Sequence, residues 1–484
     1  MNTFSRLTTC LGIILVFNLP GGAQINNSLY FMHGVPQSNR INPAHQPNSN
    51  FYLGFPGLAP LRIDAGSSSI AYGDVIYPHP TQDSLITFLH PLGDKQAFMD
   101  LLKPVNSIGS DFGISLVSLG FRTGVGFFTI DLTTRTEGRI SYPGDLARLI
   151  LNGAEEGVTY QLDGIGADFS VYNEASLGWS AAILDNLTLG ARAKVLFGAA
   201  NFSTTSSELA VTTSQDVWNV HSDMRFNASI PFADVLLDGN GMFDSIAIAD
   251  ELQNSNGPSI RDITNYIFNT NNLGLGLDVG VDFRPIDQLL ISASVMDLGF
   301  INWKDGTEGV SYKTDYDFSG FEINPLEFSD GFTFDSTLSQ LGDSLTNFLT
   351  FTSGGTYTKR LNTKLFVGAS YSLTPKINFG ILSRTDFRNG EISQQATASV
   401  NLTTGRFANL TLSYSYMNAS YKNFGAGFSF NVGPLNMYMI SDNIINVTVW
   451  PQEARSVNLW FGMNLVFGYK KFMRKEATDR PLVY

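Results

Sequence analysis

Hydrophobic and polar residues alternate strictly along residues 272–284. Leu275 and Leu277 fall on one face of an extended chain, and Gly276 and Asp278 fall on the other. Successive side chains of a β-strand point to opposite faces, so the pattern predicts a strand with an apolar face and a polar, glycine-rich face. Such runs are longer than the five or six residues, roughly, of most strands in soluble sheets. The same period recurs in residues 408–416, 423–432 and 456–467.

Two kinds of connection separate the alternating runs. Short turns rich in Pro, Gly, Asp, Asn or Thr join the two runs of each predicted hairpin. Much longer polar segments lie between hairpins, with helix-like pieces at 83–102, 259–268 and 338–349, and a hairpin predicted outside the membrane at 206–230. Short turns at one rim and long loops at the other are typical of bacterial outer-membrane barrels. The long segments are 74–109, 137–161, 206–270 and 305–354.

We therefore predict an all-β fold, a transmembrane antiparallel up-and-down β-barrel with long extracellular loops that contain short helices. An even number of strands, about 14 within bounds of about 12 to 16, returns the chain to the side where it starts. The predicted strands are 60–73, 110–120, 124–136, 162–184, 188–205, 271–283, 288–304, 355–373, 376–388, 391–403, 407–418, 421–432, 434–441 and 454–469.

The N-terminal residues carry the features of an export signal. Arg6 precedes an apolar run from Leu11 to Phe17, and small residues end at Ala23. The run is shorter than the roughly 20 residues that span a bilayer as a helix, so we expect cleavage and not an anchor. The predicted segments are a signal peptide at 1–23, a periplasmic or lumen-plugging segment at 24–50, the barrel at 51–469 and a basic periplasmic tail at 470–484.

Composition narrows the classes of function. Charged residues make up 15 % of the chain, against about 25 % in a typical soluble domain, and the formal net charge is −13. The single cysteine, Cys10, lies in the predicted signal, which argues against disulfides, thiolate metal sites and cysteine nucleophiles in the mature chain. An acidic chain without a basic block also argues against nucleic acid as a partner.

Charged residues on the polar faces of the strands are the candidate site. An Arg or Lys on the lipid face at mid-bilayer costs about 2–4 kcal/mol, so these charges are expected in the lumen, with glycines that allow close packing of a plug. Two readings stay open: mutually paired charges that hold the barrel's shape, or a substrate path. The candidates are Asp168, Glu174, Arg192, Lys194, Asp278, Asp282 and Lys364.

Aromatic residues near predicted strand ends suggest interfacial girdles, with ordinary barrel packing as the alternative. The candidates for these girdles are Trp303, Trp450, Trp460, Tyr414, Tyr416, Tyr438 and Tyr469.

Several short motifs resemble a known group of proteins. The Asn42-Pro43-Ala44 element, the Asp297-Leu298-Gly299 element and the segments 34–38, 52–57 and 458–464 resemble an uncharacterised family of Bacteroidetes outer-membrane barrels. The first two elements are also similar to the PorP/SprF proteins associated with type IX secretion and gliding, and more distantly to the fatty-acid channel FadL. The resemblance implies a barrel of about 14 strands in which residues 24–50 enter the lumen as a hatch. It transfers no catalytic residue.

Motifs for catalysis or metal binding are not evident. The five histidines show no pair at metal-ligand spacing, and no phosphate loop or nucleophile elbow appears. Asp234, Asp238, Asn240 and Asp244 suggest surface calcium binding less readily than a solvated acidic loop. We expect neither enzymatic activity, nor a cofactor, nor a metal.

The sequence therefore predicts a non-enzymatic protein of the Gram-negative outer membrane, in contact with its lipid. The long loops favour a partner-binding component of envelope or secretion machinery. The alternative is a plugged channel for small, including hydrophobic, molecules, which the polar lumen face and the hatch-like start favour. A secreted soluble β protein is the third hypothesis.

Overall fold

A computed structural model describes residues 27–215, 217–237, 243–248, 259–318, 349–353, 355–404, 407–417, 420–444 and 448–468. The predicted signal peptide, the basic tail, the helix at 338–349, Tyr469 and most of the acidic loop at 234–244 lie outside the ranges with described side chains.

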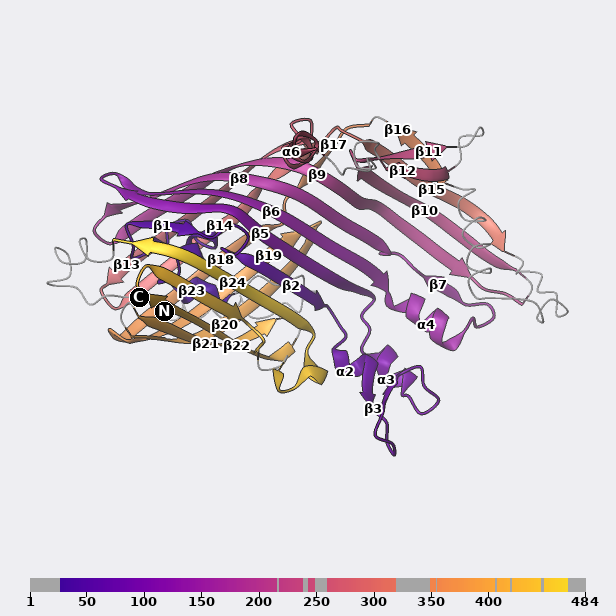
Figure 1. Cartoon of the computed structure of the whole chain (residues 1–484). Coiled ribbons are helices and arrows are strands. Elements are labelled where there is room, and N and C mark those ends of the chain that lie inside the picture. The colour runs from indigo at the N-terminus through magenta and orange to yellow at the C-terminus, as the bar shows by residue number, and fades with distance from the viewer. Residues whose placement is uncertain are drawn as a thin grey trace, which may run out of the picture.

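Long antiparallel strands close into a barrel, which confirms the predicted fold class and the strand number of 14. Figure 1 shows that the strands are inclined relative to the barrel axis. The wall strands are β1 (Phe51–Gly54) with β2 (Leu61–Ser67), β5 (Val105–Thr123), β6 (Gly126–Pro143), β8 (Gly166–Leu184), β9 (Leu187–Thr212), β13 (Leu273–Ile286), β14 (Leu289–Trp303), β17 (Tyr357–Arg360) with β18 (Thr363–Thr374), β19 (Ile377–Arg388), β20 (Glu391–Thr403), β21 (Ala408–Met417), β22 (Ser420–Val432), β23 (Leu435–Ser441) and β24 (Ser456–Phe467).

The first and last wall strands complete the ring. β24 pairs with β1 through Phe51↔Phe467 and with β2 through Leu61↔Phe461, and both β1 and β2 also pair with β5. β9 pairs with β13 in the wall, although β10 (Trp218–Ser229) lies between them in sequence. A closed ring leaves its wall strands without the unpaired edges that lipid cannot hydrate, so backbone polar groups are satisfied within the wall.

Further strands and helices lie beyond the wall (Figure 1). β10 pairs with the end of β9 and with β15, and β15 pairs with β16, which extends the wall into an outer sheet. The remaining elements are η1 (Ser28–Phe31), η2 (Pro36–Arg40), α2 (Tyr72–Val75), β3 (Ile76–Pro78), β4 (Leu85–Thr87), α3 (Lys95–Asp100), α4 (Gly144–Asn152), β7 (Thr159–Gln161), β11 (Ala233–Leu237), β12 (Phe243–Ile248), α6 (Ile260–Ile267), β15 (Thr307–Phe318), β16 (Leu349–Ser353) and η4 (Pro451–Glu453).

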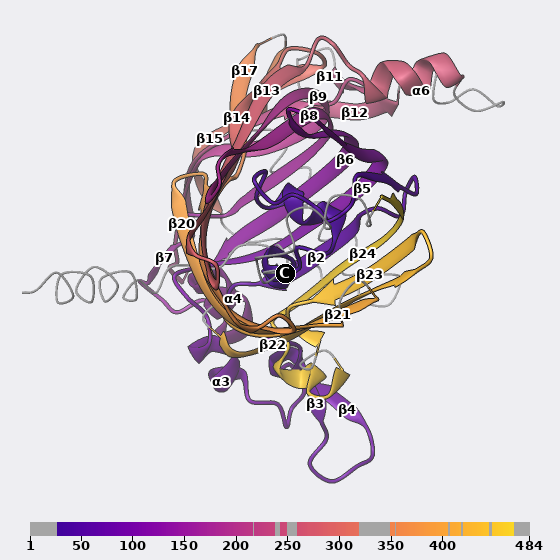
Figure 2. The same ribbon diagram turned by 90° about the vertical axis from the view of Figure 1, so that its left-hand side faces the viewer.

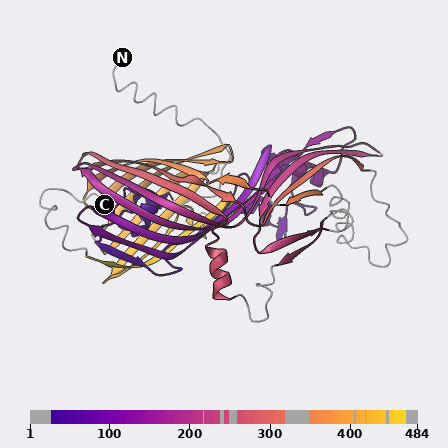
Figure 3. The same ribbon diagram turned by 90° about the horizontal axis from the view of Figure 1, so that it is seen from above.

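The two rims of the barrel differ as expected. Tight turns join β5 to β6, β8 to β9, β13 to β14 and β18 to β19 at one end, which we call the turn rim. The outer sheet and most of the helices lie at the opposite end, the loop rim (Figure 3). The hairpin predicted at 206–230 is present there as the paired ends of β9 and β10. In the described residues, no helix is long and apolar enough to span a bilayer.

Burial follows the predicted alternation. In β13, Leu275 and Leu277 are exposed on the outer face, whereas Asp278 and Asp282 are buried inside. A wall that is apolar outside and polar inside suits a barrel surrounded by lipid.

Several predicted boundaries were wrong. β5, β6 and β9 extend to Val105, Pro143 and Thr212, because these strands continue past the barrel proper, where β5 pairs with β6 and the end of β9 pairs with β10. The predicted strand 355–373 is divided into β17 and β18. Of the predicted strand 60–73, only residues 61–67 form a strand, β2, which shares its place in the wall with β1 at 51–54. Of the helix expected at 83–102, only α3 is helical, because β4 occupies part of that segment.

For three of the girdle candidates, the alternative of packing within the barrel holds. Trp303, Trp460 and Tyr438 are buried on the inner side of the wall, where they pack in apolar clusters. Tyr414 and Trp450 are exposed.

The orientation of the faces can be tested with a charge. Ile381 on β19 is 60 % exposed on the outer face. We expect Ile381→Arg to lower the free energy of unfolding of the barrel in lipid vesicles by about 2–4 kcal/mol, because the guanidinium would lie in hydrocarbon. Urea titration of folding measures the effect. Tyr316→Arg in the outer sheet is the control, and an equal loss from both variants would contradict the assignment.

Candidate functional site: the filled lumen

The first described residues, 27–50, lie inside the ring of strands (Figure 2). Side chains of this segment bond to the wall on several sides. Gln37 pairs with Asn464 of β24 at 2.6 Å, and Tyr30 donates to Ser292 of β14 at 2.8 Å. We call residues 27–50 the plug segment, since it fills the middle of the lumen.

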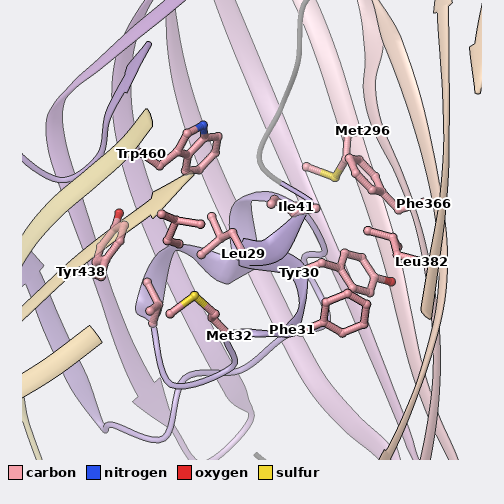
Figure 4. Close-up of a cluster of buried hydrophobic side chains, with 12 residues drawn as sticks. Leu29, Tyr30, Phe31, Met32, Ile41, Met296, Phe366, Leu382, Tyr438 and Trp460 are labelled. Atoms are coloured by element: carbon pink, nitrogen blue, oxygen red, sulfur yellow. The ribbon is translucent and has the colours of Figure 1, made fainter. Parts of the chain in front are cut away.

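An apolar cluster anchors the plug segment. Leu29, Tyr30, Phe31 and Met32 of η1 and its end are buried against the inner wall (Figure 4). Burying one large apolar side chain contributes about 1.5–3 kcal/mol, so this cluster alone is a substantial anchor. Its wall members are Met296, Phe366, Leu382, Tyr438, Ile440 and Trp460.

Lumen-facing glycines let the Asn42-Pro43-Ala44 element approach the wall. A Cβ on Gly190 would lie 2.2 Å from the carbonyl carbon of Pro43, and one on Gly280 would lie 2.0 Å from Asn42 Oδ1. Real Cβ atoms essentially never come closer than 3.0 Å to such neighbours. The Asn42 side chain also accepts from the Ala44 amide at 2.9 Å and donates to Asp282 at 3.1 Å. The wall and the plug segment are therefore complementary in shape.

Asp282, one of the predicted lumen charges, belongs to this contact. Its Oδ1 lies 3.4 Å from Nε2 of His45, whose ring packs edge-on against His33 with centroids 4.4 Å apart. Burial and the adjoining His45 ring lower the pKa of His33 below its ordinary value. His33 is therefore neutral at neutral pH, which permits the two imidazole rings to pack together.

Charged side chains from five strands converge on Asp297. Its carboxylate accepts from Lys194 at 2.5 Å, from Lys364 at 2.8 Å and from Arg135 at 3.0 Å. Its backbone N–H donates to Asp278 at 2.7 Å. We call this group the Asp297 network; its members are Arg135, Glu174, Arg192, Lys194, Asp278, Asp297 and Lys364.

The backbone at Asp297 makes this convergence possible. The pairing of β13 with β14 shifts register between Leu277 and Val279, opposite a bulge in β14 that contains Asp297. Asp297 has a φ of +60°, in the left-handed region, which aspartate tolerates better than most residues. A β-bulge redirects the side chain at its extra residue. The family-like Asp297-Leu298-Gly299 element therefore marks the bulge that positions the carboxylate.

The structure brings five of the seven predicted charges together. Glu174, Arg192, Lys194, Asp278 and Lys364 all belong to the Asp297 network, and all are nine-tenths buried or more.

The other two predicted charges lie elsewhere. Asp282 contacts the plug segment, as described above. Asp168 lies nearer the loop rim, where it pairs with Lys359 and accepts from Asn389 at 2.6 Å.

Two important members of the site were not among the predicted lumen charges. Arg135 binds both Asp297 and Glu174, and Asp131 pairs with Arg40 of the plug segment at 2.7 Å. Both were detectable, because Asp131, Thr133, Arg135 and Glu137 alternate with Leu132 and Thr134 in period two. Cross-lumen partners, by contrast, leave no local signal in the sequence.

A large cavity lies in the wall where β14 changes partner. β14 pairs with β18 up to Met296 and with β17 from Phe300. The cavity measures about 1350 Å³ and is lined by outward-facing Leu298 and Phe300 together with Lys359 and Asn389, which bond to Asp168 on the inner side of the wall. We call it the wall cavity. It joins the outer apolar surface to the lumen side.

An apolar patch lies on the lumen side next to the wall cavity. Leu196, Ile301 and Trp303 are buried there with Tyr172. Leu361, which lines the wall cavity, packs against this patch. Leu361 therefore connects the lining of the wall cavity to a buried apolar cluster inside the wall.

The chain matches a known protein family. Residues 43–442 match DUF5723, a family of unknown function. The chain belongs to this family. The matched range takes in Asn42's neighbours Pro43 and Ala44, the Asp297 network and the lining of the wall cavity. No curated protein matches the chain.

Several solved structures are similar to this family member, although each shares only a small fraction of identical residues with it. The toluene transporter TbuX of Ralstonia pickettii is 9% identical, with 93% of this chain and 100% of that chain covered and a TM-score of 0.40. A FadL homologue of Pseudomonas aeruginosa is 10% identical, with 93% and 99% covered and a TM-score of 0.39. The toluene transporter TodX of Pseudomonas putida is 9% identical, with 88% and 93% covered and a TM-score of 0.36. The expected kinship with PorP/SprF proteins and with Bacteroidetes stays a prediction.

The Asp297 network can be tested by neutralising its centre. Asp297→Asn leaves three buried cations without their shared carboxylate, so we expect the free energy of unfolding to fall by about 3 kcal/mol. Urea unfolding of the detergent-solubilised barrel, followed by tryptophan fluorescence, measures it. The control is Asp315→Asn, whose side chain is 75% exposed beside His221. A loss no larger than that of the control would show that the network is not held by Asp297.

Plug docking can be tested with one added methyl group. Gly190→Ala would place a Cβ against the backbone of Pro43, which cannot move aside as a flexible side chain can. We expect the plug segment to undock and trypsin to cleave after Arg40 at least about tenfold faster. Gly309→Ala, where the nearest atom lies 3.6 Å away, is the matched control. Equal cleavage rates in both variants would contradict tight docking.

Proposed function

We propose that this family member is a plugged channel of the Gram-negative outer membrane that admits small, largely apolar molecules through its wall. The observation that carries the proposal is the wall cavity, whose lining comes from both the outer apolar face and the lumen side. A solute dissolved at the outer apolar surface would reach the lumen through it without crossing the polar rim.

The surroundings of the cavity support an apolar cargo. Leu275, Leu298 and Phe300 line its outer side and are each more than a third exposed. On the inner side, Leu361 continues into the apolar patch around Trp303. Apolar lining with a few polar groups is the usual composition of a site for a small organic molecule.

The plug segment supports a gated channel over an open pore. It fills the lumen between the wall cavity and the turn rim, so we expect no steady ion conductance from the intact protein in planar bilayers. Its own charges and amides complement the wall, as Arg40 does with Asp131. The polar groups of residues 37–45 can be rehydrated when they leave the wall, whereas the apolar cluster at η1 holds the start of the plug segment in place.

The partner-binding function stays a prediction. The described residues of the outer sheet show no feature that distinguishes this sheet from an ordinary extracellular extension. The expectations that the protein has no catalytic activity, no cofactor and no metal also stay predictions.

Filling the wall cavity tests the proposed function. Thr358 lies exposed on the cavity lining. We expect Thr358→Trp to reduce several-fold the uptake of the apolar dye N-phenylnaphthylamine by intact cells that express the protein, because the indole ring would obstruct the cavity. Dye fluorescence measures uptake, and recovery of the folded barrel from the outer membrane normalises it.

Thr212→Trp provides the matched control. Thr212 is likewise exposed and paired across strands, but it lies in the outer sheet and does not line the cavity. If both variants take up dye at the parent rate, or if both lose uptake equally, the wall cavity is not the entry path.

A further inference from the structure

The hairpin between β19 and β20 ends in a tight, rigid tip. Asn389 and Gly390 have φ values of +47° and +83°, as the two central residues of a type I′ turn require. β19 and β20 are 12 and 13 residues long, whereas β8 and β9 have 19 and 26, so the wall is low at this hairpin. We call residues 388–391 the hairpin tip.

The hairpin tip bonds to strands on the far side of the lumen. Glu391 pairs with Arg139 of β6 at 2.6 Å, and Asn389 donates to Asp168 of β8 at 2.6 Å. Arg388 lies 3.7 Å from Asp111 of β5. Three separate contacts therefore connect one short hairpin to three strands.

Ring order shows that these contacts cross the lumen. From β6 to β20 the wall passes through β8, β9, β13, β14, β18 and β19 in one direction, and through β5, β2, β24, β23, β22 and β21 in the other. The two strands are therefore opposite one another. A circular ring of this size would be at least about 20 Å across, farther than an arginine and a glutamate side chain reach together. The ring must be narrowed at this level, and Figure 3 shows it narrow between the barrel and the outer sheet.

A second cross-lumen contact strengthens the closure. Lys359 of β17 pairs with Asp168 and bonds to Ser170 at 3.0 Å. Asn362, which follows β17, donates to Glu137 of β6 at 2.5 Å. Asp168 is thus shared by the hairpin tip and by β17, the two segments that border the wall cavity. Its carboxylate holds both segments against the opposite wall.

We propose that the hairpin tip is a second gate, which closes the loop side of the lumen independently of the plug segment. The inference rests on the proposed channel function only for the role of the gate. Closure itself is measured as the access of a dissolved reagent to the lumen, whether or not a solute is transported. The Glu391 side chain is 39% exposed and that of Asp168 is 21% exposed. The pairs at Glu391 and Asp168 are therefore weakened by salt more readily than those of the buried Asp297 network, whereas the third contact, Arg388 with Asp111, is itself buried.

The closed gate explains why solutes would need a path through the wall. With the tip bound to β5, β6 and β8, the direct route from the loop rim into the lumen is obstructed. The wall cavity lies beside the tip, and Arg388, Asn389 and Glu391 line it. Release of the tip would therefore both widen the cavity and open the axial route.

Thiol labelling from solution tests the gate. Thr133 lines a cavity of about 40 Å³ below the gate and beside Arg40 of the plug segment. The reporter is Thr133→Cys, in a chain whose one cysteine is replaced by Cys10→Ser. The reagent is a charged methanethiosulfonate, which cannot follow an apolar path. We expect slow labelling of the closed protein, with a rate that rises as salt is added.

Two substitutions should open the gate. Asp168→Asn and Glu391→Gln each remove a charge-assisted contact across the lumen, so we expect labelling of the reporter at least about tenfold faster in either background. Asp223→Asn is the matched control, because Asp223 also pairs with two cations, Arg225 and Lys313, but within the outer sheet. The control should label at the parent rate.

The outcomes separate this gate from the proposed cargo path. Labelling that is fast in the parent, unchanged by both substitutions or accelerated equally by Asp223→Asn would overturn the gate, whatever the dye uptake. Labelling that rises only in the two gate variants supports it, even if Thr358→Trp leaves dye uptake intact and the apolar cargo path fails. Recovery of the folded barrel from the outer membrane is checked for every variant, and a variant that is not recovered folded is replaced by Asn389→Gly, which removes one contact and no charge and keeps the positive φ of the turn.

Discussion

One constraint organises this protein: charges admitted to a lipid-facing barrel must all lie inside it, and there they must neutralise one another. The outer face carries exposed apolar side chains such as Leu275 and Ile381, and an ion on this face would lie in hydrocarbon. Inside, removal from water costs several kcal/mol per ion unless partners are close. Asp297 meets this condition for three cations at once, and the bulge at its backbone aims its carboxylate where the three converge. Most other features of the lumen are arranged around that network.

The same constraint determines which kinds of side chain the plug segment presents to the wall. A plug made only of apolar residues could not contact a polar inner wall, and the segment instead combines an apolar cluster at η1 with polar groups further along. Arg40 extends the paired charges of the wall through Asp131, and Asn42 does so through Asp282. Glycines at positions 190 and 280 admit the backbone of the plug segment where a side chain would exclude it. The lumen is therefore shaped by wall and plug together.

Closure at two levels distinguishes this barrel from an open pore. The plug segment closes the turn side through extensive burial, whereas the hairpin tip closes the loop side through a few contacts, of which those at Glu391 and Asp168 are partly exposed. The first closure is strong and the second weak, because desolvated contacts are worth more than those screened by water. In the proposed channel, the wall cavity would be the apolar approach to the lumen between these two closures. Such a channel would select solutes by their solubility in an apolar phase more than by their size.

The sequence by itself determined the barrel class, the strand number and, away from bulges, the face on which the residues of a strand lie, because period-two alternation is local and lipid enforces it on every strand. It therefore predicted that Lys194 and Asp278 point inward, although it did not show that they meet. Tertiary structure alone decided which charges pair across the lumen, such as Glu391 with Arg139, and that Trp303 packs inside the wall and not in a girdle. Those outcomes depend on ring order and on where the wall narrows. Both arise from the closure of the whole sheet, which no single strand encodes.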